Sequence, residues 1–328
     1  MSASWLHEFG RRGYQDIKRR VAHCAHSLTD FMPKLLVLVY HRILPEVTFN
    51  PLNTIVSVRT FIQQLDLLAN KYPIVSLKDA IAQCRSGGET ADVQIVLTFD
   101  DGYWDSYEVA FPILRKKGLP AAFFVVTNYI DSDRPVWDWE IVTLLNAYRE
   151  IIEVEVEGAV LRQRKNERRI SFAERILERI KSADVETAKK VVEILRQQSR
   201  DYPRLHSLED GVCMKWEQVR TMCQNGMEIG SHSLSHRSLA RIPLEEAITE
   251  ITKSKQIIED NTKANCDHFA FPFGSETDYS EVLVERVERA GFETCLLNIH
   301  GYNHLREDTF CLRRIIMTES TNLAYLLG

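Results

Sequence analysis

Short apolar runs alternate with helical patterns along most of the chain. Apolar runs bounded by turn residues indicate buried strands, and apolar residues three and four apart indicate helices. We expect strands at residues 35–40, 54–58, 93–99, 121–126, 227–230, 267–272 and 293–298. We expect helices at residues 57–72, 77–85, 243–260 and 279–290. This alternation predicts an α/β fold built as a barrel.

Residues 131–213 interrupt this alternation. We expect in them a short strand at 151–156 and helices at 171–180 and 184–198. Ser171 and Glu174 have the spacing of a capping box, and Asp184 is a favourable first residue for the second helix. We therefore expect an N-terminal helical segment at 1–34, then a barrel over 35–328 that carries a mostly helical insertion at 131–213.

Composition excludes several classes of protein. The chain has 328 residues, of which 45% are hydrophobic and 27% are charged, as in soluble globular proteins. A net charge of −5 gives no electrostatic reason to bind nucleic acid. Seven cysteines with irregular spacing do not form a disulfide framework, which favours reduced thiols and a cytoplasmic location.

Residues 1–34 contain no apolar run long enough for a signal peptide or a spanning helix. Aromatic and aliphatic residues are instead interleaved with arginine and lysine. This pattern is typical of a basic helix at a membrane surface, here the inner membrane face. The alternative is a helix packed on the barrel or on a partner, which Gly10 and Gly13 favour slightly because they weaken a continuous amphipathic helix.

The sequence Thr-Phe-Asp-Asp-Gly at 98–102 directly follows an apolar strand pattern. Adjacent residues at a strand end point in opposite directions, so Asp100 and Asp101 can serve two different roles. Two close carboxylates repel each other, and a bound cation relieves that repulsion. The alternative is an ordinary Asp-Asp-Gly turn.

A pair of histidines follows a later strand pattern. His232 and His236 stand four residues apart and share one face if the segment turns helically. Two imidazoles and one carboxylate suit a divalent transition metal and leave positions open for water. Isolated histidines at this spacing are more often solvated or capping residues, but an aspartate pair and a histidine pair at strand ends together favour a catalytic metal site.

These two segments together resemble the polysaccharide deacetylases of carbohydrate esterase family 4, with the NodB-homology fold. The resemblance covers residues 35–130 and 212–316. It implies a distorted (β/α)7 barrel and a bound divalent metal. It also implies that Asp100 is the general base and that Asp101, His232 and His236 bind the metal. Zinc is the default metal, and the ligand types also suit cobalt, nickel or iron.

A third segment, Phe-Ala-Phe-Pro-Phe-Gly at 269–274, resembles the family's Arg-x-Pro-Tyr loop in a subgroup that has Phe-Ala-Tyr-Pro-Tyr-Gly. Ala270 stands where many members have an arginine that orients the base, so that role is vacant or filled from elsewhere. The resemblance places Pro272 and Phe273 beside the substrate, with the Phe273 amide as oxyanion donor. The segment also fits an apolar strand broken by proline and glycine.

Two histidines compete for the role of general acid. His41 ends the first apolar strand in a Tyr-His-Arg sequence typical of that subgroup. His300 is the candidate for the family's Leu-x-His motif, but residues 301–303 and 312–315 resemble the subgroup that lacks this histidine. We favour His41. Tyr103 beside the aspartate pair and Trp137 at the start of the insertion are further candidates for substrate contact. Trp137 alternatively anchors the insertion to the barrel.

The expected function is metal-dependent hydrolysis of an N-acetyl group on a sugar. The acetylated substrate is a polysaccharide, a lipid-linked sugar or a nucleotide-linked sugar. Three alternatives stay open: hydrolysis of another amide or an O-acetyl ester, a catalytically silent sugar-binding protein suggested by Ala270, and a membrane or partner dock within a biosynthetic assembly.

Overall fold

A computed structural model describes residues 34–86, 93–147, 153–198, 212–304 and 310–323. The expected N-terminal helix and its membrane contact lie outside these residues, so they stay predictions, as does the cytoplasmic location. Within the described part of the chain, no helix has the length and apolarity that crossing a membrane requires.

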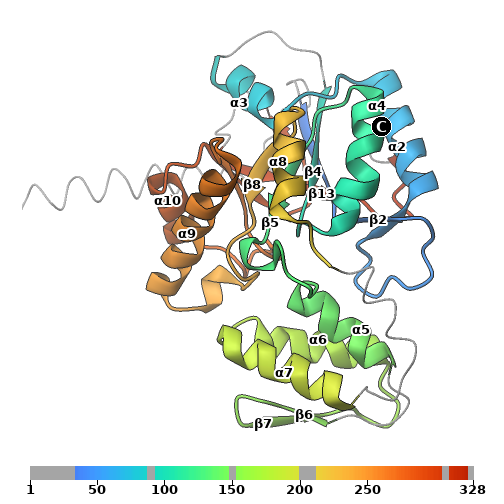
Figure 1. The fold of residues 1–328 in the computed structure, drawn as a ribbon, viewed down its shortest axis with the longest axis vertical. Helices are drawn as coiled ribbons and strands as arrows, with labels where there is room; N and C mark the ends of the chain where they lie inside the picture. The colour runs from blue at the N-terminus through green and yellow to red at the C-terminus, as the bar shows by residue number, and fades with distance from the viewer. Residues whose placement is uncertain (1–33, 87–92, 148–152, 199–211, 305–309, 324–328) are drawn as a thin grey trace, which may run out of the picture.

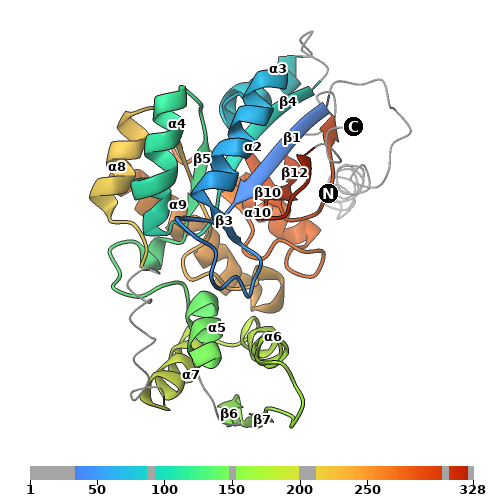
Figure 2. The same ribbon diagram turned by 90° about the vertical axis from the view of Figure 1, so that its right-hand side faces the viewer.

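A nine-stranded sheet forms the centre of the molecule, and helices cover its outside (Figures 1 and 2). Most of its strands are parallel and buried, which explains why they appear in the sequence as continuous apolar runs. The parallel strands are β1 (Lys34–Tyr40), β4 (Val93–Phe99), β5 (Ala122–Val125), β8 (Glu228–Ser231), β9 (His268–Ala270), β10 (Thr294–Leu297) and β12 (Cys311–Arg313). A short strand, β11 (Asn303–His304), pairs antiparallel with β1.

The sheet closes on itself through two very short strands. β12 pairs with β10, and β13 (Ile315–Ile316) pairs in parallel with β1. A single residue, Arg314, separates these two strands in the chain, so residues 311–316 act as one seam between the first and last barrel strands. The result is a nearly closed α/β barrel, which confirms the expected fold.

The helices lie between successive strands, and most begin where the sequence predicts. The Ser57 hydroxyl accepts from the Thr60 amide at the start of α2, and the Ser76 hydroxyl accepts from the Asp79 amide at the start of α3. The helices of the barrel are α2 (Val58–Lys71), α3 (Leu77–Ser86), α4 (Phe111–Lys117), α8 (Trp216–Gln224), α9 (Leu244–Thr262) and α10 (Glu281–Arg289), with short turns η1 (Ser106–Ala110), η2 (Thr127–Tyr129) and η4 (Leu239–Arg241).

One predicted strand belongs elsewhere. The strand expected at 54–58 is β3 (Ile55–Ser57), and it pairs with β2 (Arg42–Leu44) in a separate two-stranded sheet. Its apolar residues are buried, which explains the pattern, but apolarity alone does not say which sheet a strand joins.

The insertion forms a lobe below the barrel in Figure 1. Its elements are α5 (Trp137–Ala147), the hairpin β6 (Glu153–Val156) and β7 (Ala159–Arg162), α6 (Arg169–Ile180) and α7 (Val185–Gln198). Asp184 caps α7 as predicted, since its carboxylate accepts from the Thr187 amide. The predicted capping box is wrong: α6 begins at Arg169, so Ser171 lies inside the helix.

The two ends of the insertion meet. The Asp131 amide donates to the Met214 carbonyl at 3.0 Å, and the Met214 amide donates to the Gly102 carbonyl at 2.8 Å. Tyr103 and Cys213 form an isolated antiparallel bridge beside them. The chain therefore leaves and re-enters the barrel next to the loop that carries the aspartate pair.

A substitution at Gly230 would test how tightly β8 packs in the barrel, just before the histidine pair in the chain. A Cβ at this position would lie 2.4 and 2.5 Å from two ring carbons of Phe124 on the neighbouring strand. We expect Gly230→Ala to lower the free energy of unfolding by about 1–3 kcal/mol, measured by urea denaturation, because both groups are buried. Phe124→Leu makes room, so the double variant should lose less than the sum of the single losses. An unchanged denaturation midpoint in Gly230→Ala would contradict this packing.

Candidate metal centre and catalytic site

The candidate residues gather at the carboxyl ends of the parallel strands. His41 follows β1, the aspartate pair follows β4 and His232 follows β8. In parallel α/β barrels these strand ends meet at one edge, where active sites form. Here they line a cavity of about 380 Å³ between the barrel and helices α5 and α6 of the insertion. We call it the catalytic cavity.

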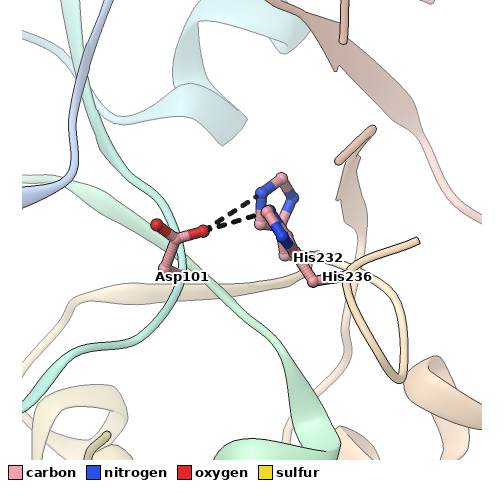
Figure 3. Close-up of side chains that lie close together, drawn as sticks. All are labelled: Asp101, His232 and His236. Atoms are coloured by element: carbon pink, nitrogen blue, oxygen red, sulfur yellow. Dashed lines mark ion pairs between the residues drawn. The ribbon is translucent and has the colours of Figure 1, made fainter. Parts of the chain in front are cut away.

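Asp101, His232 and His236 point toward one another within this cavity (Figure 3). All three are buried, and their ligand atoms lie within 4.8 Å of one another. Asp101 Oδ1 lies 3.6 Å from Nε2 of His232 and 3.4 Å from Nε2 of His236. Ligands about 2.1 Å from a tetrahedral zinc ion are about 3.4 Å apart, so both distances from Asp101 are close to those between ligands of one zinc ion.

The electrostatics of Asp101 also fit a cation. Its Oδ1 is buried and has no hydrogen-bond partner. Burial raises its pKa well above the usual range, and the neighbouring Asp138 and Asp100 carboxylates raise it further. A divalent cation held by the same oxygen would offset both effects.

A hydrogen bond orients His232, and a carboxylate faces His236. Nδ1 of His232 lies 2.8 Å from the Ala270 carbonyl and donates to it, which leaves Nε2 as a free lone pair facing Asp101. Burial lowers the pKa of His232 to about 3, so the ring is neutral and available as a ligand. Nδ1 of His236 lies 3.5 Å from Asp138 Oδ2, a carboxylate contributed by α5 of the insertion.

The histidine segment is not a helical turn, which corrects the expectation from the four-residue spacing. The two rings converge because Ser233 and His236 adopt left-handed backbone conformations, with φ of 67° and 59°. Glu250 of α9 holds this loop, since its carboxylate accepts from the amides of Leu234 and Ser235. Asp101 also has a positive φ of 74°, so strained backbone is concentrated at the site.

Asp100 is paired with Arg314, the residue between β12 and β13. Both guanidinium Nη atoms donate to the carboxylate, each at 2.7 Å, and neither side chain has any solvent exposure. Burial by itself would raise the pKa of Asp100, but Arg314 and His232 together lower it to about 2. The carboxylate is therefore ionised and fixed in orientation.

Arg314 thus orients the Asp100 carboxylate, for which the sequence offers no arginine at position 270. Sequence reasoning missed it because the contact joins positions 214 residues apart. The available signal was a pair of arginines, Arg313 and Arg314, between two short apolar stretches, and stretches this short have no distinctive period. The pairing of β13 with β1 is what brings this residue over the end of β4.

The two candidate acids lie in different environments. His41 lines the catalytic cavity with Asp101 and both candidate ligand histidines, and burial lowers its pKa while Asp100 opposes that shift. His300 is exposed and does not line the cavity.

Of the four candidates for oxyanion or substrate contact, two line the cavity and two do not. Phe273 lines the cavity, with its ring centroid 4.7 Å from that of His236, and Tyr103 lines it as well. Pro272 is buried and does not line the cavity, and its carbonyl accepts from the Gly274 amide.

Trp137 does not line the catalytic cavity but packs beside two residues that do, with its ring centroid 6.5 Å from that of His236 and 6.1 Å from that of Phe273. Its buried indole N–H donates to the carbonyls of Ser235 and His236, which matches the alternative that it anchors the insertion to the barrel. Trp139, two residues later, faces the cavity instead.

Solved structures share this fold. The Streptococcus pyogenes deacetylase PplD in complex with acetate matches with a TM-score of 0.59 and 19% identity, over 90% of this chain and 97% of that one. IcaB from Ammonifex degensii matches with a TM-score of 0.57 and 19% identity, over 87% of this chain and 92% of that one. A de-N-acetylase from Aggregatibacter actinomycetemcomitans matches with a TM-score of 0.57 and 17% identity, over 90% of this chain and 98% of that one.

A curated relative gives a similar result at the level of sequence. YxkH of Bacillus subtilis strain 168, which is named as a polysaccharide deacetylase, is 19% identical over 246 residues. That alignment covers 75% of this chain but 59% of YxkH, so the chain spans less than two thirds of this relative. A family model for polysaccharide deacetylases matches residues 87–295, well over half of the 328 residues. The chain belongs to the polysaccharide deacetylase family.

Proposed function

We propose that the protein is a metal-dependent deacetylase that hydrolyses an N-acetyl group on a sugar. The observation that carries this proposal is the buried cluster of Asp101, His232 and His236 next to the ion-paired Asp100, within one cavity. Zinc is the default metal for this ligand set. When bound, such a metal polarises the acetyl carbonyl and lowers the pKa of water.

Asp100 is the general base in this proposal. Its pKa of about 2 keeps it ionised at neutral pH, and its contact with Arg314 fixes it beside His232, whose Nε2 lies 3.7 Å away. It accepts the proton of the attacking water. Arg314 is a positioning residue that keeps the base charged and oriented.

His41 transfers a proton to the leaving amine, and the Phe273 amide stabilises the developing oxyanion. Both residues line the catalytic cavity, which supports these assignments. The alternative of a catalytically silent protein rests on the absence of an arginine at Ala270 to orient the base. Arg314 makes that contact with Asp100 instead.

The first prediction concerns the metal. His232→Ala/His236→Ala should lose bound metal on dialysis, by elemental analysis, and release no acetate from N-acetylglucosamine oligomers. Asp100→Asn is the matched control, since it should keep the metal while turnover falls about 10²–10⁴-fold for want of a base. Full metal retention in the double histidine variant would defeat the assignment.

The second prediction concerns the buried ion pair. Arg314→Met should lower the free energy of unfolding by about 3–5 kcal/mol because it leaves a buried carboxylate uncompensated. Asp100→Asn/Arg314→Met removes that charge and should recover part of the loss. Urea denaturation with chelator in all samples measures both. Equal stability of Arg314→Met and the parent would mean that the pair does not form.

The third prediction separates the two candidate acids. His41→Ala should slow acetate release from an N-acetyl sugar much more than hydrolysis of 4-nitrophenyl acetate, whose leaving group needs little protonation. His300→Ala should change neither rate, because this side chain is exposed outside the cavity. A selective loss on the amide in His300→Ala alone would reverse the assignment.

A further inference from the structure

Two cysteine side chains meet where the closure of the barrel begins. Cys295 on β10 and Cys311 on β12 occupy paired positions of two parallel strands, and their Sγ atoms lie 3.3 Å apart (strands in Figure 2). Neighbouring strands are about 4.7–4.9 Å apart, and a disulfide joins Cα atoms about 4.4–6.8 Å apart. The strand pairing therefore holds both residues within reach of a disulfide. We call them the cysteine pair.

Both thiols point to the outer face of the sheet. The residues that follow them, Leu296 and Leu312, pack in one cluster with side chains of β1, β4, β5 and β9, which places that cluster inside the barrel. Successive side chains of a strand point to opposite faces, so Cys295 and Cys311 point outward together. A bond between the two sulfurs thus requires neither strand to turn.

The two thiols differ in their access to solvent. Cys295 is fully buried, whereas Cys311 is partly exposed. An oxidant in solution therefore meets Cys311 first, with a second thiol already in contact behind it, which is the arrangement of cysteines that respond to oxidation. Elsewhere, burial raises the pKa of Cys84, Cys213 and Cys266, which disfavours the reactive thiolate at those positions.

The position of the cysteine pair gives a bond there a structural effect. Cys311 begins the seam, and Arg314, three residues later, holds the Asp100 carboxylate. The strands of the seam are short, with three residues in β12 and two in β13. A covalent bond from β10 to the start of the seam would restrain this end of the barrel in the unfolded chain and in the folded one.

We propose that Cys295 and Cys311 are an oxidation site, at which a reversible disulfide fastens the seam to β10. This modification does not depend on the deacetylase activity. The oxidant is a small-molecule disulfide such as glutathione disulfide. In a reducing compartment the pair stays as two thiols, and the bond forms when the oxidant accumulates.

The exchange takes place in two steps. The Cys311 thiolate attacks one sulfur of glutathione disulfide, which forms a mixed disulfide and releases one glutathione thiolate. Cys295 then loses its proton, and its sulfur attacks the Cys311 sulfur and releases the second glutathione. The two cysteines together give up two protons and two electrons, and glutathione disulfide is reduced to two glutathione thiols.

Peptide mass spectrometry of the folded full-length protein tests the site. After treatment with glutathione disulfide, the remaining thiols are alkylated and the protein is digested with trypsin, which separates residues 290–306 from residues 307–313. We expect these two peptides to be linked by a disulfide, with a mass lower by two hydrogens than the sum of the reduced peptides. Dithiothreitol should restore both thiols.

Three variants assign the roles. Cys295→Ala should retain glutathione on Cys311, since no second thiol displaces it, and Cys311→Ser should show no modification of the buried Cys295. Cys223→Ser is the matched control: Cys223 is partly exposed on α8, so this variant should keep the linkage. Recovery of both thiols in the oxidised parent, glutathione retained on its Cys311, or a linkage between other cysteines in place of this pair would each overturn the proposal.

Urea denaturation tests the effect on the seam. The oxidised parent should have a denaturation midpoint at least about 0.5 M higher than the reduced parent, because the bond closes a loop in the unfolded chain. The same oxidant should leave the midpoint of Cys295→Ala no higher. A linked pair whose midpoint does not rise would show that the disulfide does not fasten the seam.

Discussion

The ion pair between Asp100 and Arg314 ties the catalytic edge of the sheet to the seam that closes it. Both charges are fully buried, and moving each of them out of water costs several kcal/mol, which their mutual attraction offsets only if the geometry is close to ideal. Two contacts of 2.7 Å meet that condition. Arg314 reaches Asp100 because β12 and β13 join β10 to β1. The contacts that close the barrel therefore also orient the proposed base.

The metal-binding candidates depend on support from other elements. The carbonyl of Ala270 on β9 orients His232, Asp138 of the insertion faces His236, and Glu250 on α9 holds the loop between them. Left-handed backbone at Asp101 and His236 brings the ligand atoms together at a conformational cost. Such strain persists only where neighbouring contacts fix the loop, and these supporting side chains provide those contacts.

Much of the fold follows from local pattern, whereas parts of the site do not. The long apolar runs predicted β1 and β4 to within one residue of Lys34–Tyr40 and Val93–Phe99, because buried parallel strands have a strong signal. Convergence of the Asp and His pairs could be predicted for the same reason, since parallel strand ends share an edge. Arg314 could not, because β12 and β13 have three and two residues, too few for any periodicity.

The meeting of the insertion's ends at Asp131 and Met214 has an evolutionary consequence. A segment that leaves and returns at one point can be lengthened, shortened or exchanged without changing the register of any barrel strand. The barrel edge that carries the candidate metal ligands and the part of the insertion that lines the catalytic cavity can then change at different rates within one chain. The first helix of the insertion is the exception, because Trp137 and Asp138 contact the histidine loop, so an exchange that preserves activity has to retain residues 131–147 and replace only the later part of the insertion.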